Sequence, residues 1–267
     1  MTKKVKKKKT TPRKASRRNR KLKAAGLKLS AALVLMFAAL SFMSVGWQVI
    51  KNPFLILSSL SFDSPKTHER TWSEFGPTFM RAETSDLPGE FLAAIAQTES
   101  SGRQWTNTEW SLDLNRGVFN IVAPISTSFG LMQFTKETFE RNKHLCVVDG
   151  RVETKKPWYM LDGCWFTPLK TRASAEHSVN IAGAYLQNEI NAANAARRSP
   201  MSKDQAMKFA AVTHLCGKNV AKRLADKRFR IPRGQLCGTH SVKLYVKKIK
   251  TNYKKFRSLH EEALASR

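Results

Sequence analysis

The chain has 267 residues, enough for one or two ordinary domains, and its apolar share of 42% is ordinary. It carries 47 Lys and Arg against 20 Asp and Glu, a net charge of +27. An excess of this size argues against a basic partner. It favours an anionic one, such as nucleic acid, an anionic membrane surface or another acidic partner.

The positive charge is concentrated at the amino end. Residues 1–62 hold 15 basic residues and no acid, whereas residues 63–267 hold 32 basic and 20 acidic residues, a net of +12. Residues 1–28 contain 14 of the basic residues and show no hydrophobic periodicity. We therefore expect them to form a disordered, basic cytoplasmic tail.

Residues 29–50 form a run of 22 uncharged and mostly apolar residues. A helix of this length spans roughly 30 Å of hydrocarbon, and Trp47 near its far end suits a membrane interface. The basic flank predicts that everything after Ile50 lies outside the cytoplasm. The sequence thus predicts a single-pass inner-membrane protein whose main domain is in the periplasm.

Two alternatives remain open at this end of the chain. The apolar run could be a cleaved secretory signal with Ser44-Val45-Gly46 as its cleavage site, although the run is long for a signal core. The basic tail could instead bind nucleic acid. Beside a membrane span, anchoring to anionic lipid is the simpler interpretation, and no nucleic-acid partner is expected.

Four cysteines lie on the predicted outer side, where disulfides can form: Cys146, Cys164, Cys216 and Cys237. Three connectivities are possible. Pairing near neighbours closes two loops of about 20 residues, each worth roughly 3 kcal/mol, and we expect these pairs. The sequences His144-x-Cys146 and His214-x-Cys216 leave structural zinc as an alternative, but no Cys-x-x-Cys occurs. No metal or cofactor is therefore expected.

Residues 51–85 are expected to be a connector, because Asn52-Pro53 breaks the first helix and Ser, Pro and charged residues follow. Residues 86–259 show a helical pattern, which predicts one mostly α domain preceded by one transmembrane helix. The expected helices are 88–100, 173–195, 203–213 and 242–259.

The first of these helices ends at Glu99-Ser-Ser-Gly102. Leu92, Ile95 and Ala96 share the face of Glu99, so its carboxylate projects from the apolar side. Burial and the negative end of the helix dipole should both raise the pKa of Glu99, which would let it donate and recover a proton near neutral pH. On position alone, a Glu that points to water or to a basic neighbour is the simpler interpretation.

The surrounding motifs reverse that interpretation. Glu99-Ser100 at the end of an Ala- and Ile-containing helix, followed by Gly130-Leu131-Met132-Gln133, resembles the lytic transglycosylase family. Blocks around His214 and Tyr245 are similar to that family's Ala-Tyr-Asn-x-Gly helix and Tyr-Val segment. The resemblance covers about residues 86–258 and implies a lysozyme-like catalytic domain.

The resemblance implies that Glu99 is the catalytic residue and that the substrate-binding residues are Ser128, Gln133, His214 and Tyr245. Gly130 would let the backbone approach the saccharide, with Gln133 beside the sugar and Tyr245 lining the cleft. The implied reaction cleaves the β-1,4 bond between MurNAc and GlcNAc in peptidoglycan. A single acid, Glu99, would protonate the glycosidic oxygen and then activate the muramic C6 hydroxyl, giving a 1,6-anhydro ring.

The chain departs from the family pattern in three places. Residues 106–124 are an apparent insertion that could form a cleft wall, and His214-Leu215 replaces Tyr-Asn. Residues 142–165 look like an added loop with aromatic side chains that could stack on sugars. No second acid stands in a comparable motif; the candidates are Glu109 and Asp113.

Two other functions stay open: a hydrolytic muramidase resembling goose-type lysozyme, and a non-catalytic glycan-binding or assembly subunit. The expected partners are peptidoglycan, the membrane and, by analogy only, an envelope-spanning secretion or conjugation machine.

Overall fold

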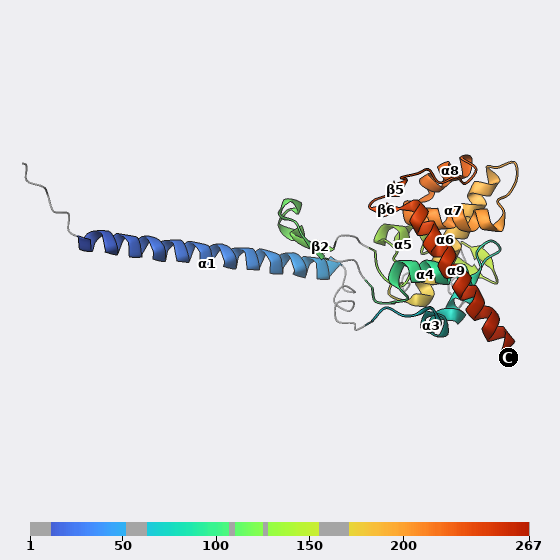
Figure 1. The fold of residues 1–267 in the computed structure, drawn as a ribbon, viewed down its shortest axis with the longest axis horizontal. Coiled ribbons are helices and arrows are strands. Elements are labelled where there is room, and N and C mark those ends of the chain that lie inside the picture. The colour runs from blue at the N-terminus through green and yellow to red at the C-terminus, as the bar shows by residue number, and fades with distance from the viewer. Residues whose placement is uncertain (1–11, 52–62, 107–109, 125–127, 155–170, 267) are drawn as a thin grey trace, which may run out of the picture. The chain divides into compact units, whose positions relative to one another are not determined.

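The computed structural model describes residues 12–51, 63–106, 110–124, 128–154 and 171–266. Over these residues the chain is mostly helical, as the sequence predicts (Figure 1). The chain divides into two compact units, one formed by residues 1–53 with 110–123 and the other by residues 54–109 with 124–267. Each unit has its own pattern of buried and exposed side chains.

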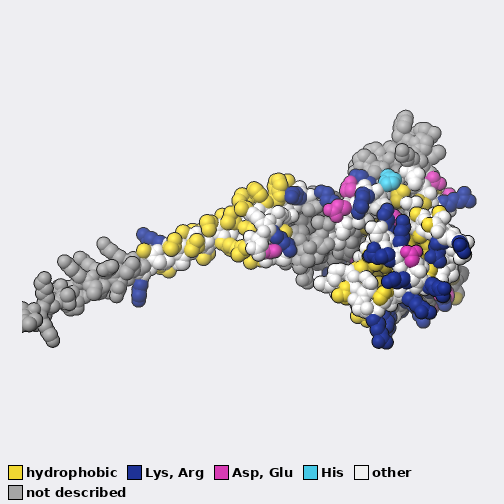
Figure 2. All heavy atoms as spheres, turned by 90° about the horizontal axis from the view of Figure 1, so that it is seen from above, with side chains coloured by type: hydrophobic (Ala, Val, Ile, Leu, Met, Phe, Trp, Pro, Cys, Tyr) yellow, Lys and Arg dark blue, Asp and Glu magenta, His cyan; other side chains and the backbone are white. Residues whose placement is uncertain are grey.

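The first unit is built on one long helix, α1 (Pro12–Lys51). Its segment Ala25–Lys51 is long and apolar enough to cross a membrane, and apolar side chains cover much of it (Figure 2). The prediction of a disordered tail is wrong from Pro12 onward, because these basic residues are helical. Lys, Arg and Ala are good helix formers, and extending an existing helix avoids the cost of nucleation.

A short hairpin belongs to the same unit. Strands β1 (Trp110–Leu112) and β2 (Val122–Pro124) pair with each other. Between them lie two 3-10 turns, η1 (Leu114–Arg116) and η2 (Val118–Asn120), and η2 packs on α1. The expected insertion at residues 106–124 therefore forms, in its described part, a hairpin on the apolar helix.

The second unit packs its helices around α4 (Gly89–Ser100), in which every residue from Gly89 to Gln97 is buried. Helices α3 (His68–Arg81), α6 (Ala175–Ala195) and α9 (Val242–Ala265) contact it. The other elements are α5 (Lys136–Asn142), β3 (Cys146–Val148), β4 (Arg151–Glu153), α7 (Lys203–Cys216), α8 (Lys218–Asp226), β5 (Leu236–Cys237) and β6 (His240–Ser241). The four expected helices are all present, and the last two extend further than predicted.

Helix α3 corrects the expected connector at residues 51–85. Phe75 and Phe79 are buried in the core, and the Thr71 hydroxyl donates to the side-chain oxygen of Gln97 on α4 at 2.8 Å. The spacing of Trp72, Phe75 and Phe79 is helical, but Pro77 between them argued against a helix. The helix accommodates Pro77 because tertiary packing of its aromatic face outweighs the lost hydrogen bond.

Disulfides stabilise the second unit. Cys216 at the end of α7 is bonded to Cys237 in β5, with 5.5 Å between their Cα atoms, as the sequence predicts. Cys146 is also disulfide-bonded, and its predicted partner Cys164 lies outside the described residues. With both thiols in disulfides, neither Cys146 nor Cys216 can supply the thiolate that the zinc alternative requires.

Candidate active site

Glu99 lies where the core meets a cleft. Leu92, Ile95 and Ala96 are fully buried, and the Glu99 side chain on the same face of α4 is 19% exposed. The helix ends immediately afterwards, because Ser101 takes the left-handed conformation. A Cβ on Gly102 (φ 73°) would collide with the Thr71 hydroxyl, so this turn requires glycine.

Helix α9 brings Tyr245 to the same place. Tyr245, Ile249 and Phe256 are buried on one face of the helix, at the spacing that the sequence shows. Asn252 on this face donates to the Thr98 hydroxyl at 3.0 Å, and Lys248 donates to the Thr98 carbonyl at 3.2 Å. These contacts hold α9 against the last turn of α4.

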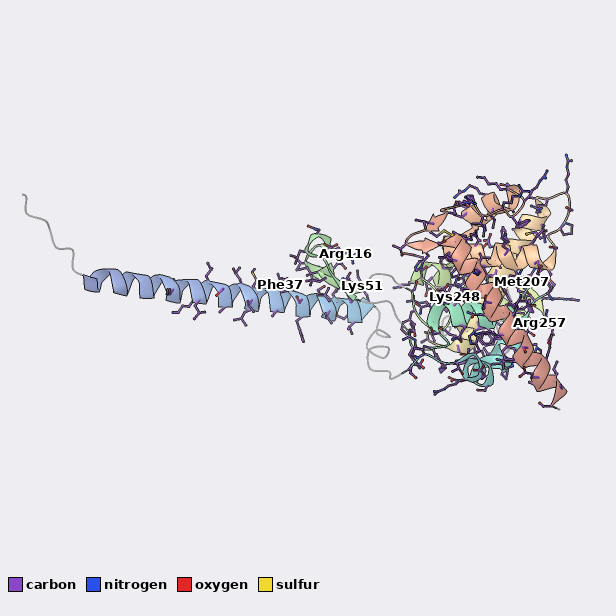
Figure 3. All side chains as sticks on the ribbon, in the orientation of Figure 1. Phe37, Lys51, Arg116, Met207, Lys248 and Arg257 are labelled. Carbon is purple, nitrogen blue, oxygen red and sulfur yellow. A yellow bond between two sulfur atoms is a disulfide. The ribbon has the colours of Figure 1, made fainter. Side chains whose placement is uncertain are left out.

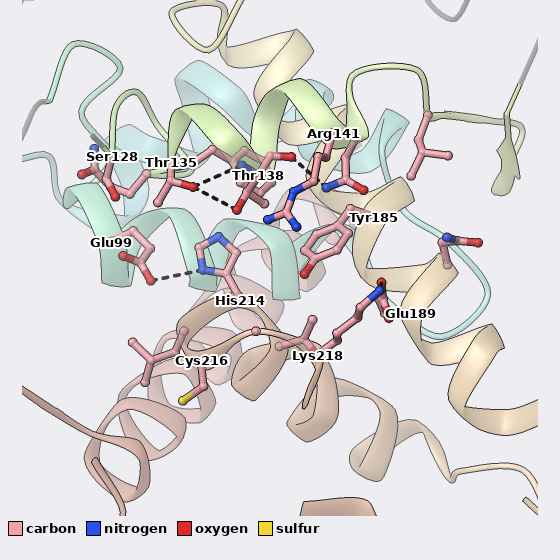
Figure 4. A pocket seen from close by; sticks show the side chains of 18 of the residues that line it. Glu99, Ser128, Thr135, Thr138, Arg141, Tyr185, Glu189, His214, Cys216 and Lys218 are labelled. Atoms are coloured by element: carbon pink, nitrogen blue, oxygen red, sulfur yellow. Dashed lines mark hydrogen bonds and ion pairs between the residues drawn. The ribbon is translucent and has the colours of Figure 1, made fainter. Parts of the chain in front are cut away.

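The side chains of Glu99, Tyr245 and His214, from three different helices, meet at one point. The Tyr245 hydroxyl donates a hydrogen bond to Glu99 Oε1. His214 of α7 places its Nδ1 atom 3.4 Å from the same oxygen (Figure 4) and 3.4 Å from the Tyr245 hydroxyl. The His214 side chain is only 5% exposed, and its ring centroid is 5.7 Å from that of Phe134. The sequence named all three polar residues, and the structure brings them together.

The pKa of the Glu99 carboxyl is lowered, not raised as the sequence suggested. Burial is the largest single influence and raises it, but the hydrogen bond and charge of His214, the Tyr245 hydrogen bond and the charge of His240 together outweigh burial. Burial, the charge of Glu99 and the shared hydrogen bond raise the pKa of Tyr245 well above its usual value. Tyr245 therefore stays protonated as a donor, and the lowered pKa favours the carboxylate form of Glu99.

Glu99 opens into a cleft of about 870 Å³. Ser128, Gln133 and His214, three of the predicted substrate-binding residues, line it together with Glu99. Tyr245, predicted to line the cleft, is not among its described lining residues; it is buried and contacts Glu99. The expected cleft wall at residues 106–124 is likewise absent from the described lining.

Gln133 is positioned by its own turn. It has a positive φ of 49°, and its Nε2 atom donates to the carbonyl oxygens of Thr106 and Gly130, each at 2.8 Å. These bonds use the amide nitrogen and leave the side-chain oxygen as the group that a ligand can reach. At Gly130 a Cβ would collide with the Arg172 carbonyl oxygen, so close packing of the chain requires glycine there, and the predicted approach of a sugar to this backbone stays a prediction.

The cleft also contains residues that no motif identified. Glu189 of α6 lines it, is 8% exposed and lies 3.5 Å from Lys218 Nζ. Burial and the charge of Glu189 raise the pKa of neighbouring Tyr185 to about 12.

Other cationic or titratable lining residues are Arg141, His144 and His240. Figure 4 shows Glu189 and Lys218 away from Glu99, beyond Tyr185 and His214. The cleft therefore has a second carboxylate, which sits in its own ion pair.

Of the two second-acid candidates from the sequence, Glu109 lies outside the described residues. Asp113 belongs to the hairpin of the first unit and is paired with Arg116 at 3.2 Å. The aromatic cluster of the added loop, from Trp158 to Phe166, also lies outside the described residues. Met132 is fully buried in the core, as is Leu131.

The chain matches no protein-family model, no curated protein and no solved structure. The features that bear on its function are the cleft residues, their geometry and the two sequence motifs that contain Glu99 and Gln133. The chemistry available at this site is proton transfer by Glu99 next to a buried imidazole, in a polar cleft large enough for an extended ligand.

Proposed function

We propose that this protein is a membrane-anchored lytic transglycosylase that cleaves the β-1,4 bond between MurNAc and GlcNAc in peptidoglycan. The observation that carries the proposal is Glu99 at the edge of the core, bound by Tyr245 and His214 and open to a large polar cleft. The proposed domain is lysozyme-like, corresponds to the second unit, helix α3 included, and acts in the periplasm. The helical segment Ala25–Lys51 is its inner-membrane anchor.

The first step needs a proton on Glu99, although the neighbouring side chains lower the pKa of this carboxyl group. A bound glycan displaces water from the carboxylate, and burial is the influence that raises this pKa. The proton comes from solvent in the open cleft, and His214, whose Nδ1 atom lies 3.4 Å from Glu99 Oε1, helps to hold the carboxyl group in place. Protonated Glu99 then delivers the proton to the glycosidic oxygen as the bond to C1 breaks.

The second step closes the ring. Glu99 is now a carboxylate again and takes the proton of the muramic C6 hydroxyl, whose oxygen forms the new bond to C1. The product is a 1,6-anhydro sugar, and no water is consumed. An internal hydroxyl has a large advantage in effective concentration over a bimolecular nucleophile, so one carboxylate is sufficient. Tyr245 supports both steps by holding Glu99 in place through its hydroxyl.

The charges around the cleft suit an acidic polymer. Arg141 and Lys218 line it, and residues 63–267 carry a net charge of +12. Peptide stems of peptidoglycan carry carboxylates, which these side chains would attract. Service to an envelope-spanning secretion or conjugation machine fits a membrane-tethered enzyme that opens the wall locally, and this assignment is by analogy alone.

Glu189 favours one alternative, a hydrolytic muramidase in which a second carboxylate activates water. Its ion pair with Lys218 and its position beyond Tyr185 argue instead for a role in binding. The replacement of Tyr-Asn by His214-Leu215 is compatible with a glycan-binding subunit that lacks turnover. Digestion of purified cell wall distinguishes all three, because anhydro ends, reducing ends or no new ends would form.

The anchor is tested separately from the chemistry. A reporter enzyme that is active only in the periplasm should be active when it is fused after residue 85. The full-length protein should resist extraction from membranes by carbonate. Release of a shortened soluble protein would instead establish cleavage near Ser44-Val45-Gly46.

A further inference from the structure

One face of the apolar helix α1 is polar. Ser41, Ser44 and Gln48 follow one another at helical spacing within the segment that is apolar enough to cross a membrane. A hydroxyl or amide that faces hydrocarbon without a partner is costly, so such side chains in membrane helices usually face another part of the protein. Ser44 is completely buried and Gln48 is 6% exposed, although most of the described part of α1 is exposed.

The hairpin is what covers this face. The Ser44 hydroxyl donates to the carbonyl oxygen of Val122 at 3.0 Å and accepts from the Val122 N–H at 3.1 Å. Gln48 Nε2 donates to the Phe119 carbonyl at 3.3 Å and to Asn120 Oδ1 at 2.8 Å. Ser44 and Gln48 thus bond polar groups of the hairpin, whereas the buried Ser41 hydroxyl has no hydrogen-bond partner among the described residues.

Several apolar side chains of the hairpin are exposed, although Ile121 and Ala123 are buried. Leu112, Leu114, Val118 and Phe119 are between 45% and 64% exposed, next to a helix whose Phe42 and Ile50 are 83% and 75% exposed. A soluble unit would hide these side chains and expose Ser44 and Gln48. A lipid environment favours this arrangement, in which the polar side chains are buried in the protein and the apolar side chains face outward.

The residues around this contact suit the interfacial layer of a bilayer. The Trp47 ring lies 5.5 Å from that of Phe119, and Lys51 Nζ is 5.1 Å from the Trp47 ring centroid. On the hairpin, Arg116 (Figure 3) is paired with Asp113 at 3.2 Å. Trp rings are enriched at membrane–water interfaces, and charged side chains such as those of Lys51, Arg116 and Asp113 are costly in the hydrocarbon centre.

The length of the helix agrees with this depth. Segment Ala25–Lys51 has 27 residues, about 40 Å of helix, whereas the hydrocarbon core is about 30 Å thick. Gln48 lies about 15 Å beyond the middle of this segment, so a centred span would bring it to the outer boundary of the hydrocarbon, with Ser44 about one helical turn deeper.

We propose that residues 110–124 are a second membrane-contacting element, a hairpin that docks on α1 and inserts its apolar side chains into the outer-leaflet interface. Both ends of the hairpin continue into the chain of the second unit. That unit is therefore tied to the membrane at two places in the sequence, after α1 and through the hairpin. The inference depends on the proposed membrane span of α1 and is independent of the proposed enzymatic reaction.

Lipid contact is tested with full-length protein in phosphatidylethanolamine and phosphatidylglycerol vesicles that contain nitroxide-labelled lipid. An environment-sensitive fluorophore is attached to one introduced cysteine at a time. Leu114→Cys is the test, Leu33→Cys on α1 is the positive control, and Leu264→Cys, an exposed leucine at the end of α9, is the matched negative control. We expect quenching and a blue shift at positions 33 and 114 and neither at 264.

The other outcomes overturn the proposal in distinguishable ways. Quenching at 33 but not at 114 would leave the anchor intact and remove the hairpin from the membrane. A blue shift without quenching at 114 would mean that a protein covers this surface. No quenching at 33 would remove the span and the inference with it, whatever the activity assay shows.

Docking on α1 is tested with a pair of cysteines in the same vesicles. Gln48→Cys with Asn120→Cys joins positions whose side chains are hydrogen-bonded, whereas Phe42→Cys with Asn120→Cys uses a residue on the exposed side of α1. A short thiol cross-linker should join the first pair at least tenfold more efficiently than the second. Equal efficiency, or no cross-link in either, would contradict the docked hairpin.

Discussion

The two units of this molecule arrange their side chains in opposite ways. In the second unit Phe256 is fully buried and the outer face of α9 carries lysines such as Lys247 and Lys254, which is the arrangement of a protein in water. In the first unit Ser44 is fully buried and Phe42 is 83% exposed. The two units thus leave different groups exposed, charged side chains in the second and apolar side chains in the first, which is the contrast that the proposed membrane contact of the first unit predicts.

The largest expected effect is a loss of cell-wall cleavage that leaves the lipid contact of the first unit unchanged. Glu99→Gln keeps the shape of the side chain but cannot transfer a proton, so cell-wall cleavage should fall roughly 10²- to 10⁴-fold. Fluorophores at positions 33 and 114 should remain quenched by labelled lipid. Turnover is measured by release of soluble fragments from purified peptidoglycan. Wild-type activity in this variant would move the chemistry away from Glu99, with Glu189 the next residue to change.

Matched phenylalanines test the opposite patterns directly. Phe256→Ala removes a fully buried ring and should lower the free energy of unfolding of the second unit by about 3–5 kcal/mol. Phe42→Ala, in the other unit, should change it by less than about 0.5 kcal/mol. Denaturation of the full-length protein in detergent, followed by near-ultraviolet circular dichroism, measures both. Equal losses would mean that α1 is part of the same soluble core.

A smaller effect is expected at Tyr245. Tyr245→Phe keeps the buried ring and deletes the hydrogen bond to Glu99. Hydrogen bonds to charged groups contribute about 1.5–3 kcal/mol, so turnover should fall about 10- to 100-fold. The pKa of Glu99 should also rise, because one of the influences that lowers it is gone. An unchanged rate and pH profile would show that the hydroxyl only fills space.

The smallest effect concerns acid stability. Because the folded protein holds the pKa of Glu99 below its ordinary value, the unfolded chain binds more protons as the pH falls from about 5. The Glu99 interactions thus contribute stability at neutral pH that disappears on acidification. The Tm of the wild type should drop more steeply than that of Glu99→Gln between pH 6 and pH 3. Parallel curves would contradict the lowered pKa.

The sequence predicted the parts of this molecule that local patterns determine. The helices around Glu99 and Tyr245 follow from apolar spacing, and the disulfide between Cys216 and Cys237 follows from short separation and compartment. The same spacing placed Glu99 on the apolar face of α4, and motif order pointed to His214 and Gln133, which the structure places with Glu99 in the cleft.

What the sequence missed depends on tertiary contacts. Glu189 sits within a regular helical run, and only the packing of α6 beside the cleft makes it different from other acids. The lowered pKa of Glu99 required knowing that His214 and Tyr245 reach the same oxygen. The hairpin looked like an insertion into the catalytic domain, because the hydrogen bonds from Ser44 and Gln48 join residues more than 70 positions apart.

The central claim is that Glu99 drives an intramolecular ring closure, and the products of cell-wall digestion test it most directly. Mass spectrometry of muropeptides released by the full-length protein should show chains that end in 1,6-anhydro-MurNAc, with no new reducing ends. The anhydro product is lighter than the hydrolytic one by one water, so the two outcomes are resolved in one measurement. Reducing ends as the main product would contradict the account and establish hydrolysis, with Glu189 as the carboxylate to test as the activator of water.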